Sequence, residues 1–476
     1  MARRHVLMLS AALAAGCATN PVTGKSQLSL ISESQEIQMG REAAQQTLQQ
    51  IGEVKDPALQ AYVSRIGKEL AARTERPQLP WEFHVVDDAS VNAFALPGGF
   101  IFVTRGLMTY MNNEAELATV LGHEIGHVTN RHSVSQMSKA QVAQLGLGIG
   151  SILSPTVAKY GQLAGGGHSI LFLQYSRDAE NEADLAGFRY ALNDNYDVRQ
   201  MANVFQTLDR LDQASGGQGK LPNWLSTHPA PANRIANTQA RLDTLHKSLA
   251  GSKVNRDGYL QRINGLVFGE DPRQGFFRNG VFLHPDLRFQ LTFPNGWQTQ
   301  NTAQAVIAAS PNQDAVIQLT LGQGSPSAAA QQFFSQQGVQ SNNVSNTTIN
   351  GLPAVAGYFQ AQTDQGAVAG LVTFISYGNA TYQILGYTPA AGMSQYDAVF
   401  RRAMGSFGPL TDQSVLNVQP AKVELVRVPA AMTVQEFNSR YPSSIPIAQV
   451  AIINEAGADG RLAAGQMAKR VTGGVQ

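Results

Sequence analysis

The residues best suited to chemistry lie in LATVLGHEIGHV, residues 117–128. His123 and His127 are four positions apart, so on a helix their imidazoles project from the same face, one turn apart. Two ring nitrogens can then reach one cation, and Glu124 can face a water molecule bound to that cation. HExxH on a helix supplies a zinc hydrolase with two ligands and a general base from a single turn. The segment therefore predicts His123 and His127 as metal ligands and Glu124 as the base.

A helix must position these three side chains, and the flanking residues predict one. Asn113 and Glu116 form a capping pair at its start. Apolar residues at helical spacing supply a face to bury: Leu117, Val120, Leu121 and Ile125. The alternative is a helix that carries two histidines by coincidence, because a motif this short also occurs by chance.

A catalytic zinc site needs a third protein ligand and an open position for water. Downstream, YSRDAENEADLAGFRYAL places Glu180 and Asp184 four positions apart on a helix that Ser176 caps. Glu180 can complete a His-His-Glu set, and Asp184 can orient a histidine ring from behind. Taken alone, each carboxylate could equally belong to a solvated helix face.

HEIGH followed by SRDAENEAD resembles the zinc metallopeptidases that include the CAAX prenyl endoprotease, the bacterial heat-shock membrane protease and the periplasmic beta-barrel assembly-enhancing protease. The resemblance covers roughly residues 20–270 and includes NPVTGKSQLSLISESQE, VNAFALPGGFIFVTRGL and STHPAPANRI. It implies that Glu180 is the third zinc ligand, that Asp184 is the aspartate of the ExxxD pattern, and that one Zn²⁺ is bound.

The same resemblance implies a role for His228, which lies in the proline-rich loop LSTHPAPANRI with Arg234 six residues on. A histidine in this context either steadies the tetrahedral intermediate or occupies the open coordination position and shuts the enzyme. The alternative is a surface histidine stacked on proline. The remaining histidines are expected to be loop residues rather than ligands: His84, His132, His168, His246 and His284.

Residues 1–16 read as a secretory signal, with a basic start and an apolar core too short to span a bilayer. The core ends at Cys17, the single cysteine in the chain. This arrangement resembles a bacterial lipobox, although Ala14 departs from the usual leucine. Ala18 after the cysteine favours the outer membrane. The alternative is an ordinary signal peptide cut nearby. We therefore predict a periplasmic lipoprotein, anchored to the outer membrane through Cys17.

At 476 residues, the chain is expected to form two to four domains, and its net charge of +1 excludes nucleic acid as an expected partner. The predicted fold class is α+β. Residues 17–250 form a mainly helical, gluzincin-type zinc peptidase domain with a small sheet, and residues 251–280 form a linker. Residues 281–415 form an antiparallel-sheet domain that resembles PsbP-like domains, and residues 420–476 resemble a LysM module.

Three segments allow two interpretations each. The strand at residues 91–96 is either an edge that pairs with an extended substrate or an ordinary hairpin strand. Residues 141–168 are either a buried helical pair or a membrane-facing lid. The LysM-like segment either contacts peptidoglycan weakly or is a small structural cap, since Ala431 and Met432 replace the usual glycine-aspartate.

The function predicted is a zinc-dependent endopeptidase of the bacterial cell envelope that cleaves misfolded or misassembled periplasmic and outer-membrane proteins, with a gate at His228. The alternative from another class is a chaperone-like or peptidoglycan-associated lipoprotein whose metal site is plugged. A peptidoglycan amidase or endopeptidase is a further alternative, suggested by the LysM-like segment.

Overall fold

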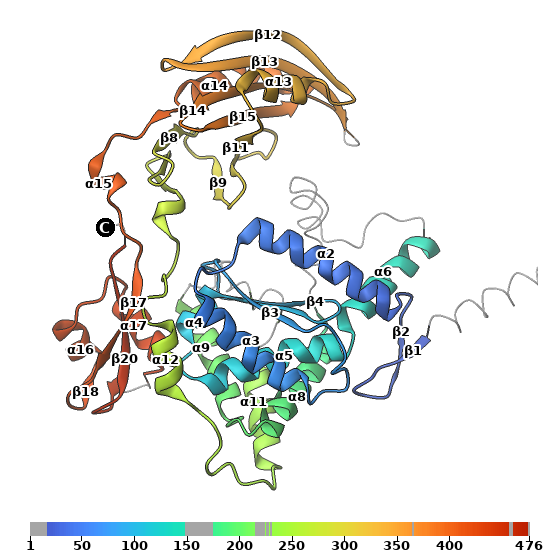
Figure 1. Ribbon diagram of the computed structural model, residues 1–476, viewed down its shortest axis with the longest axis vertical. Coiled ribbons are helices and arrows are strands. Elements are labelled where there is room, and N and C mark those ends of the chain that lie inside the picture. Colours follow the sequence, from blue (N-terminus) through green and yellow to red (C-terminus); the bar gives the residue numbers. More distant parts are fainter. Residues whose placement is uncertain are drawn as a thin grey trace, which may run out of the picture. The chain divides into compact units, whose positions relative to one another are not determined.

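The computed structural model describes residues 17–147, 175–214, 224, 228, 231–363, 366–456 and 460–474. The signal segment and most of residues 141–168 lie outside these residues. The chain divides into two units (Figure 1). Unit 1 comprises residues 1–270 and 421–473, and unit 2 comprises residues 271–420 with the last three residues.

Unit 1 is mainly helical around a small sheet. Its helices are α2 (Glu33–Ile51), α3 (Pro57–Ala71), α4 (Arg105–Tyr110), α5 (Glu114–Thr129), α6 (His132–Leu147), α8 (Arg177–Asn193), α9 (Gln200–Ala214), α11 (Pro231–Asp243) and α12 (Arg256–Ile263). A hairpin of β1 (Cys17–Thr19) and β2 (Ser26–Leu28) precedes them. In the small sheet, β5 (Phe100–Thr104) lies between β3 (Glu82–Val86), to which it is parallel, and β4 (Ala93–Leu96), to which it is antiparallel.

Helix α5 is the centre of unit 1, because all sixteen of its residues are buried. A helix buried all round belongs to the core rather than to the surface. Helices α3, α8 and α9 and the small sheet surround it (Figure 1). The predicted mixture of helices and sheet is therefore confirmed, and the motif helix lies where water is excluded.

Residues 251–280 differ from the linker that we predicted. Helix α12 lies within them, and its Tyr259, Leu260 and Ile263 are buried in the same core as α5. The Tyr259 hydroxyl donates to the carbonyl of Met108 at 2.7 Å. The glycine and asparagine residues on both sides obscure the helical pattern in the sequence. The three apolar residues nevertheless pack this short helix against the core.

The segment after residue 420 folds back onto unit 1. It contains β17 (Lys422–Arg427), β18 (Met432–Thr433), α16 (Val434–Arg440), α17 (Ile447–Ile453), β19 (Arg461–Leu462) and β20 (Met467–Thr472). The Lys469 ammonium is buried and donates to the carbonyls of Thr109 and Met111, at the C-terminal end of α4. The backbone of residues 265–268 is hydrogen-bonded to that of residues 421–423, so the segments by which the chain leaves and re-enters unit 1 lie side by side. The LysM-like assignment stays a prediction.

Unit 2 is an α+β layer structure. Its larger sheet has the order β12-β13-β14-β15-β11-β10-β9, from β12 (Val339–Ile349), β13 (Leu352–Thr363), β14 (Gly366–Tyr377), β15 (Ala380–Pro389), β11 (Val316–Gly322), β10 (Val306–Ala309) and β9 (Gln298–Asn301). A second sheet has the order β16-β8-β7-β6, from β16 (Gly408–Pro409), β8 (Phe289–Thr292), β7 (Val281–His284) and β6 (Phe276–Arg278). We expected one antiparallel sheet, and the structure has two.

Two helices sandwich the larger sheet of unit 2. Val372 and Phe374 of β14 pack with α13 (Pro326–Phe334), and their neighbours Leu371 and Ile375 pack with α14 (Met393–Gly405). Alternate residues of a strand face opposite sides of a sheet, so both faces of β14 are covered. Short helical turns, η1 (Pro272–Gln274), η2 (Ala390–Gly392) and α15 (Gln413–Leu416), connect the elements.

Candidate metal centre and active site

The two histidines of the motif converge because α5 is regular throughout. Asn113 caps its start by accepting from the backbone N–H of Glu116 at 2.9 Å. One turn apart on the buried face, His123 and His127 bring their Nε2 atoms to within 3.0 Å. Two lone pairs this close in a dry site favour a shared cation.

Helix α8 brings the carboxylates to the same point. Glycines on both helices let the two backbones approach closely: a Cβ at Gly187 would lie 2.6 Å from the backbone nitrogen of His123, and one at Gly126 would lie 2.8 Å from the carbonyl of Ala183. At this separation the Glu180 carboxylate lies 3.6 Å from Nε2 of His123 and 3.5 Å from Nε2 of His127.

His228 is the fourth member of the group. Its Nδ1 lies 3.0 Å from a Glu180 oxygen and 3.3 Å from Nε2 of His123. Its backbone N–H donates to the carbonyl of Trp224 at 2.7 Å, which links the backbones of these two residues. Ligand atoms of His123, His127, Glu180 and His228 all lie within 4.8 Å of one another, and all four side chains are buried.

These four atoms suit a tetrahedral ion. Zinc bonds of about 2.1 Å in tetrahedral geometry keep the ligand atoms about 3.4 Å apart. Five of the six separations within the group, measured to the nearer Glu180 oxygen, are 3.0–3.6 Å and span this value. Three imidazoles and one carboxylate are also the donor types that zinc prefers.

Unsatisfied polar atoms point to the same conclusion. Both carboxylate oxygens of Glu124 are buried without a hydrogen-bond partner among the described residues. A buried carboxylate without partners is strongly destabilising, so such atoms indicate an ion or water that completes the site. Oε1 of Glu124 lies 3.7 Å from Nε2 of His228, next to the four ligand atoms.

Asp184 contacts Nδ1 of His123, on the side of the ring away from the ligand group, and Arg234 in turn forms an ion pair with Asp184. The Asp184 carboxylate lies 2.9 Å from Nδ1 of His123, so it accepts the Nδ1 proton and leaves the Nε2 lone pair for a metal. The guanidinium of Arg234 stacks between the rings of Phe205 and Trp224, 4.2 and 4.4 Å from their centroids. Burial opposes ionisation of Asp184, but Arg234 and His123 outweigh it and lower the pKa of Asp184 to about 2.

The protonation of the other groups also suits metal binding. Burial lowers the pKa of His127 well below its ordinary value, so this imidazole is neutral. Burial opposes ionisation of Glu180, but the charge of His228 and a hydrogen bond with His127 hold the pKa of Glu180 well below its ordinary value. Burial disfavours a proton on His228, yet Glu180 and Glu124 outweigh it and raise the pKa of His228. A bound metal displaces that proton.

Comparison with known proteins agrees with this geometry. Residues 57–242 match peptidase family M48. This match covers the segment that carries α5 and α8, and the similarity to the family is established for that segment. The prediction of a metallopeptidase is therefore confirmed.

Two M48 relatives give the extent of the similarity. The "Beta-barrel assembly-enhancing protease" of Yersinia pestis is 30% identical over 284 residues, 56% of this chain and 57% of that protein. The protein of that name in Escherichia coli is 27% identical over 365 residues, 70% of this chain and 74% of that protein. The match thus spans little more than half of the Yersinia pestis relative.

The comparison with solved structures adds nothing for unit 2. The cyanobacterial PsbP protein of Synechocystis is 12% identical and covers 27% of this chain and 91% of its own, at a TM-score of 0.24. That score supports no conclusion, so the resemblance of residues 281–415 to PsbP-like domains stays a prediction.

Sequence patterns missed the residues that support the site by contacting its members without belonging to the ligand group. Trp224 and Phe205 enclose Arg234, and no motif marks them. His132, which we expected in a loop, begins α6 and is buried against His127. His84 and His284 lie on strands β3 and β7 rather than in loops, and His168 lies outside the described residues.

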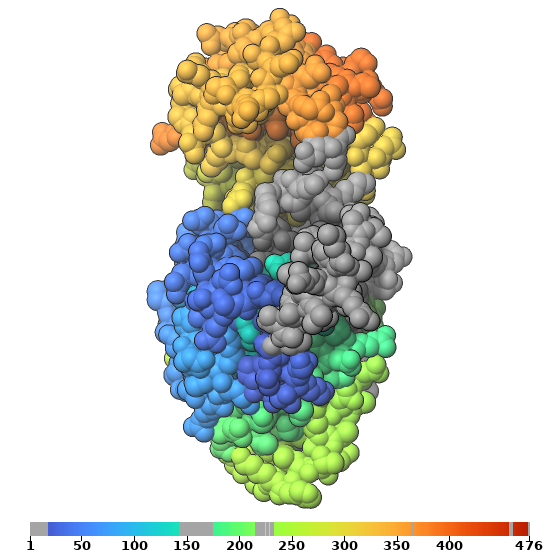
Figure 2. Space-filling view, turned by 90° about the vertical axis from the view of Figure 1, so that its right-hand side faces the viewer, coloured from blue at the N-terminus to red at the C-terminus, as the bar shows by residue number. Residues whose placement is uncertain are grey.

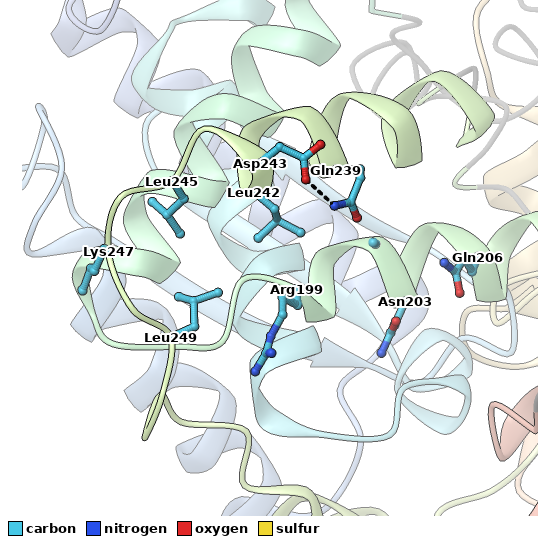
Figure 3. A pocket seen from close by; sticks show the side chains of 10 residues that line it. Arg199, Asn203, Gln206, Gln239, Leu242, Asp243, Leu245, Lys247 and Leu249 are labelled. Carbon is cyan, nitrogen blue, oxygen red and sulfur yellow. Dashed lines mark hydrogen bonds between the residues drawn. The ribbon is translucent and has the colours of Figure 1, made fainter.

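A pocket of about 440 Å³ lies elsewhere in unit 1 (Figure 3). Its wall comes from Arg199 just before α9, from Asn203 and Gln206 of α9, and from α11 and the turn after it. Figure 3 shows Leu242, Leu245 and Leu249 on the side opposite Asn203 and Gln206, and the Gln239 amide donates to Asp243. None of the predicted metal ligands lines it, so this pocket is not the active site.

Proposed function

We propose that the chain is a zinc endopeptidase of the bacterial cell envelope, that it cleaves misfolded or misassembled envelope and outer-membrane proteins, and that His228 gates its activity. The observation that carries this proposal is the buried group of His123, His127, Glu180 and His228 with Glu124 beside it. The names of the M48 relatives support the substrate class.

The catalytic step follows from the protein groups at the site. When bound, zinc lowers the pKa of water towards about 7 and polarises the scissile carbonyl. Glu124, a buried carboxylate whose oxygens accept no hydrogen bond from the described residues, takes a proton from the attacking water and delivers it to the leaving amine. Asp184 keeps the proton of His123 on Nδ1, which fixes the ring in the orientation that ligation needs.

His228 would block the active site because its ring lies both in the ligand group and next to Glu124. A catalytic zinc site keeps one position open, whereas Nδ1 of His228 takes the fourth corner of the ligand group. Its other nitrogen lies 3.7 Å from Glu124, in the space where the base must meet a water molecule. Withdrawal of the His228 loop frees both the corner and the base, so substrate binding and loop movement are coupled.

An extended substrate segment is expected to add to the small sheet along β4. Strand β4 pairs with β5 on one side, and unpaired backbone groups on the other side of an edge strand can accept another strand. Backbone pairing is independent of side chains, which suits an enzyme that degrades misfolded proteins of varied sequence.

The proposed location is the periplasmic face of the outer membrane. It rests on the signal pattern of residues 1–16 and on Cys17 as the lipidated residue. No helix among the described residues is long and apolar enough to cross a membrane. Cys17→Ser is expected to release the protein from the membrane fraction into the soluble periplasmic fraction, while an unchanged fractionation would refute the lipid anchor. The weak peptidoglycan contact through residues 420–476 is a further part of the proposal.

The test uses full-length protein and an unfolded outer-membrane barrel. Wild type with zinc should cleave it slowly, His228→Ala should cleave it faster with unchanged zinc content, and a chelator should abolish both activities. If His228→Ala instead lost its zinc, His228 would be a structural ligand and the proposed gating role would be wrong.

The second candidate is a chaperone-like lipoprotein with a plugged metal site, favoured by the occupied fourth corner. It predicts full zinc content and no cleavage even by His228→Ala. Prevention of barrel aggregation by Glu124→Gln, at the same level as wild type, would support it.

A further inference from the structure

The Nδ1 atoms of His123 and His127, which point away from the ligand group, contact different kinds of residue. Nδ1 of His123 faces a carboxylate, Asp184, at 2.9 Å. Nδ1 of His127 instead faces Nδ1 of another histidine, His132, at 3.0 Å. Nε2 of His132 in turn lies 3.2 Å from Oε2 of Glu182.

The positions of the protons in this chain follow from the metal site. If Nε2 of His127 carries the lone pair that binds the metal, its proton is on Nδ1 and is donated to His132. Nδ1 of His132 must then be an acceptor, so the proton of this ring is on Nε2, where Glu182 accepts it. One carboxylate therefore fixes the tautomers of two rings in series.

The N-terminal segment holds the turn that presents His132. The Asn20 amide donates to the carbonyl of Asn130 at 3.2 Å, and Arg131 adopts the left-handed conformation, with φ of 57°. The Arg131 guanidinium donates to Glu36 and to the carbonyl of Ile31, both at 2.9 Å. A left-handed conformation at a bulky residue persists only where its surroundings hold it.

The N-terminal segment also contacts the Glu182 carboxylate. The Lys25 ammonium lies 3.7 Å from Glu182. Figure 2 shows this neighbourhood from outside, where the darkest blue residues at the start of the described chain lie beside green ones. The N-terminal segment thus contacts both ends of the His132–Glu182 pair.

We propose that His132 and Glu182 are positioning residues that orient His127 for metal binding, with residues 20–36 fixing the turn that carries His132. The proposal rests on the proposed zinc site. His127 would thus be oriented by its own pair of residues. His123 is oriented separately, by Asp184 and Arg234.

The test is the zinc affinity of the full-length apo protein, measured by competition with a chromophoric chelator. His132→Leu and Glu182→Leu should each weaken zinc binding by about 10–100-fold, the usual effect of losing such a support. His132→Asn should restore most of the affinity, because its Oδ1 can accept from His127 and its amide nitrogen can donate. Melting temperatures of the apo variants show whether each has folded; Glu182 is partly exposed, so Glu182→Leu remains informative if His132→Leu does not fold.

His84→Leu is the matched control. His84 also lies between two carboxylates, 2.7 Å from Glu53 and 3.4 Å from Glu82, but is not near the ligands. Its loss should leave the zinc affinity unchanged. Wild-type affinity in both His132→Leu and Glu182→Leu would overturn the positioning role. Failure of wild type itself to bind zinc, or undiminished binding by His127→Ala, would instead overturn the metal site and the proposed function.

Discussion

Arg234 donates to both carboxylate oxygens of Asp184, from Nε at 2.8 Å and from Nη2 at 2.5 Å. Both side chains are buried, and Arg234 also lies 3.3 Å from Glu180. The pair therefore ties α11 to the two carboxylates of α8. Because α11 follows the His228 loop directly, it also fixes one end of that loop.

Replacement of Arg234 should be costly. Arg234→Met leaves the Asp184 charge buried without its cation, which typically destabilises a protein by about 3–5 kcal/mol. Denaturant unfolding of the apo protein measures this loss. Addition of Asp184→Asn to that variant should recover part of the stability, and failure to do so would show that the cost comes from lost packing on Trp224 and Phe205.

Glu124→Gln should separate binding from catalysis. The amide cannot accept the proton of the attacking water, so kcat should fall by about 10²–10⁴. Zinc affinity should stay within a few-fold of wild type, because Glu124 is not among the four ligand residues. Peptidase assays and zinc titration of the same preparation test this, and retained turnover would refute the base assignment.

Gly187→Ala should push α5 and α8 apart. The added Cβ would lie 2.6 Å from the backbone nitrogen of His123, a contact that the backbone must relieve by moving. We expect a loss of about 1–3 kcal/mol, as for overpacked cores, together with weaker zinc binding. Gly405→Ala in α14 is the control, since nothing lies within 4 Å of its added Cβ, and it should be neutral.

Unit 2 should lose stability in acid through His284. Burial lowers the pKa of His284 to about 4, and its Nδ1 accepts from the backbone N–H of Leu287, which requires the neutral ring. The unfolded chain binds a proton below about pH 6.5, whereas the folded chain does so only below about pH 4. Stability should therefore fall as the pH drops from 6.5 to 4, by up to about 3 kcal/mol.

His284→Phe keeps an aromatic ring beside Phe282 and Phe289 and removes the titration. Calorimetric melting across this pH range should show a smaller acid loss in the variant than in wild type. An identical loss in both proteins would place the titrating group elsewhere.

Local periodicity predicted much of what the structure contains. The HExxH helix, the helix with Glu180 and Asp184, and most strands of unit 2 have apolar residues at regular spacing. Alternation predicts strands at residues 354–362, 367–377 and 381–387, and β13, β14 and β15 end within a few residues of these bounds. Strand β12 was missed because VQSNNVSNTTI is polar on both faces and largely exposed. Its backbone pairing with β13, not its side chains, makes it a strand.

Contacts between distant segments were beyond prediction from pattern. Nothing local marks Lys469 as a side chain that becomes buried against the end of α4, because a lysine normally indicates solvent. His132 likewise looks like any polar residue after a helix, and its role depends on Glu182, fifty residues later. The placement of His228 beside Glu180 rested on family resemblance alone, since no spacing rule relates a loop to a helix.

The pairing of residues 265–268 with residues 421–423 has a practical consequence. Unit 2 is inserted between two segments that are already neighbours, as the backbone N–H of Phe268 donates to the carbonyl of Ala421 at 2.8 Å. Residues 271–420 can therefore be excised and the cut ends rejoined by a short Asn-Gly turn without stretching the chain. Such a shortened protease, compared with the full chain on the same unfolded barrels, measures directly what the insertion contributes to the choice of substrate.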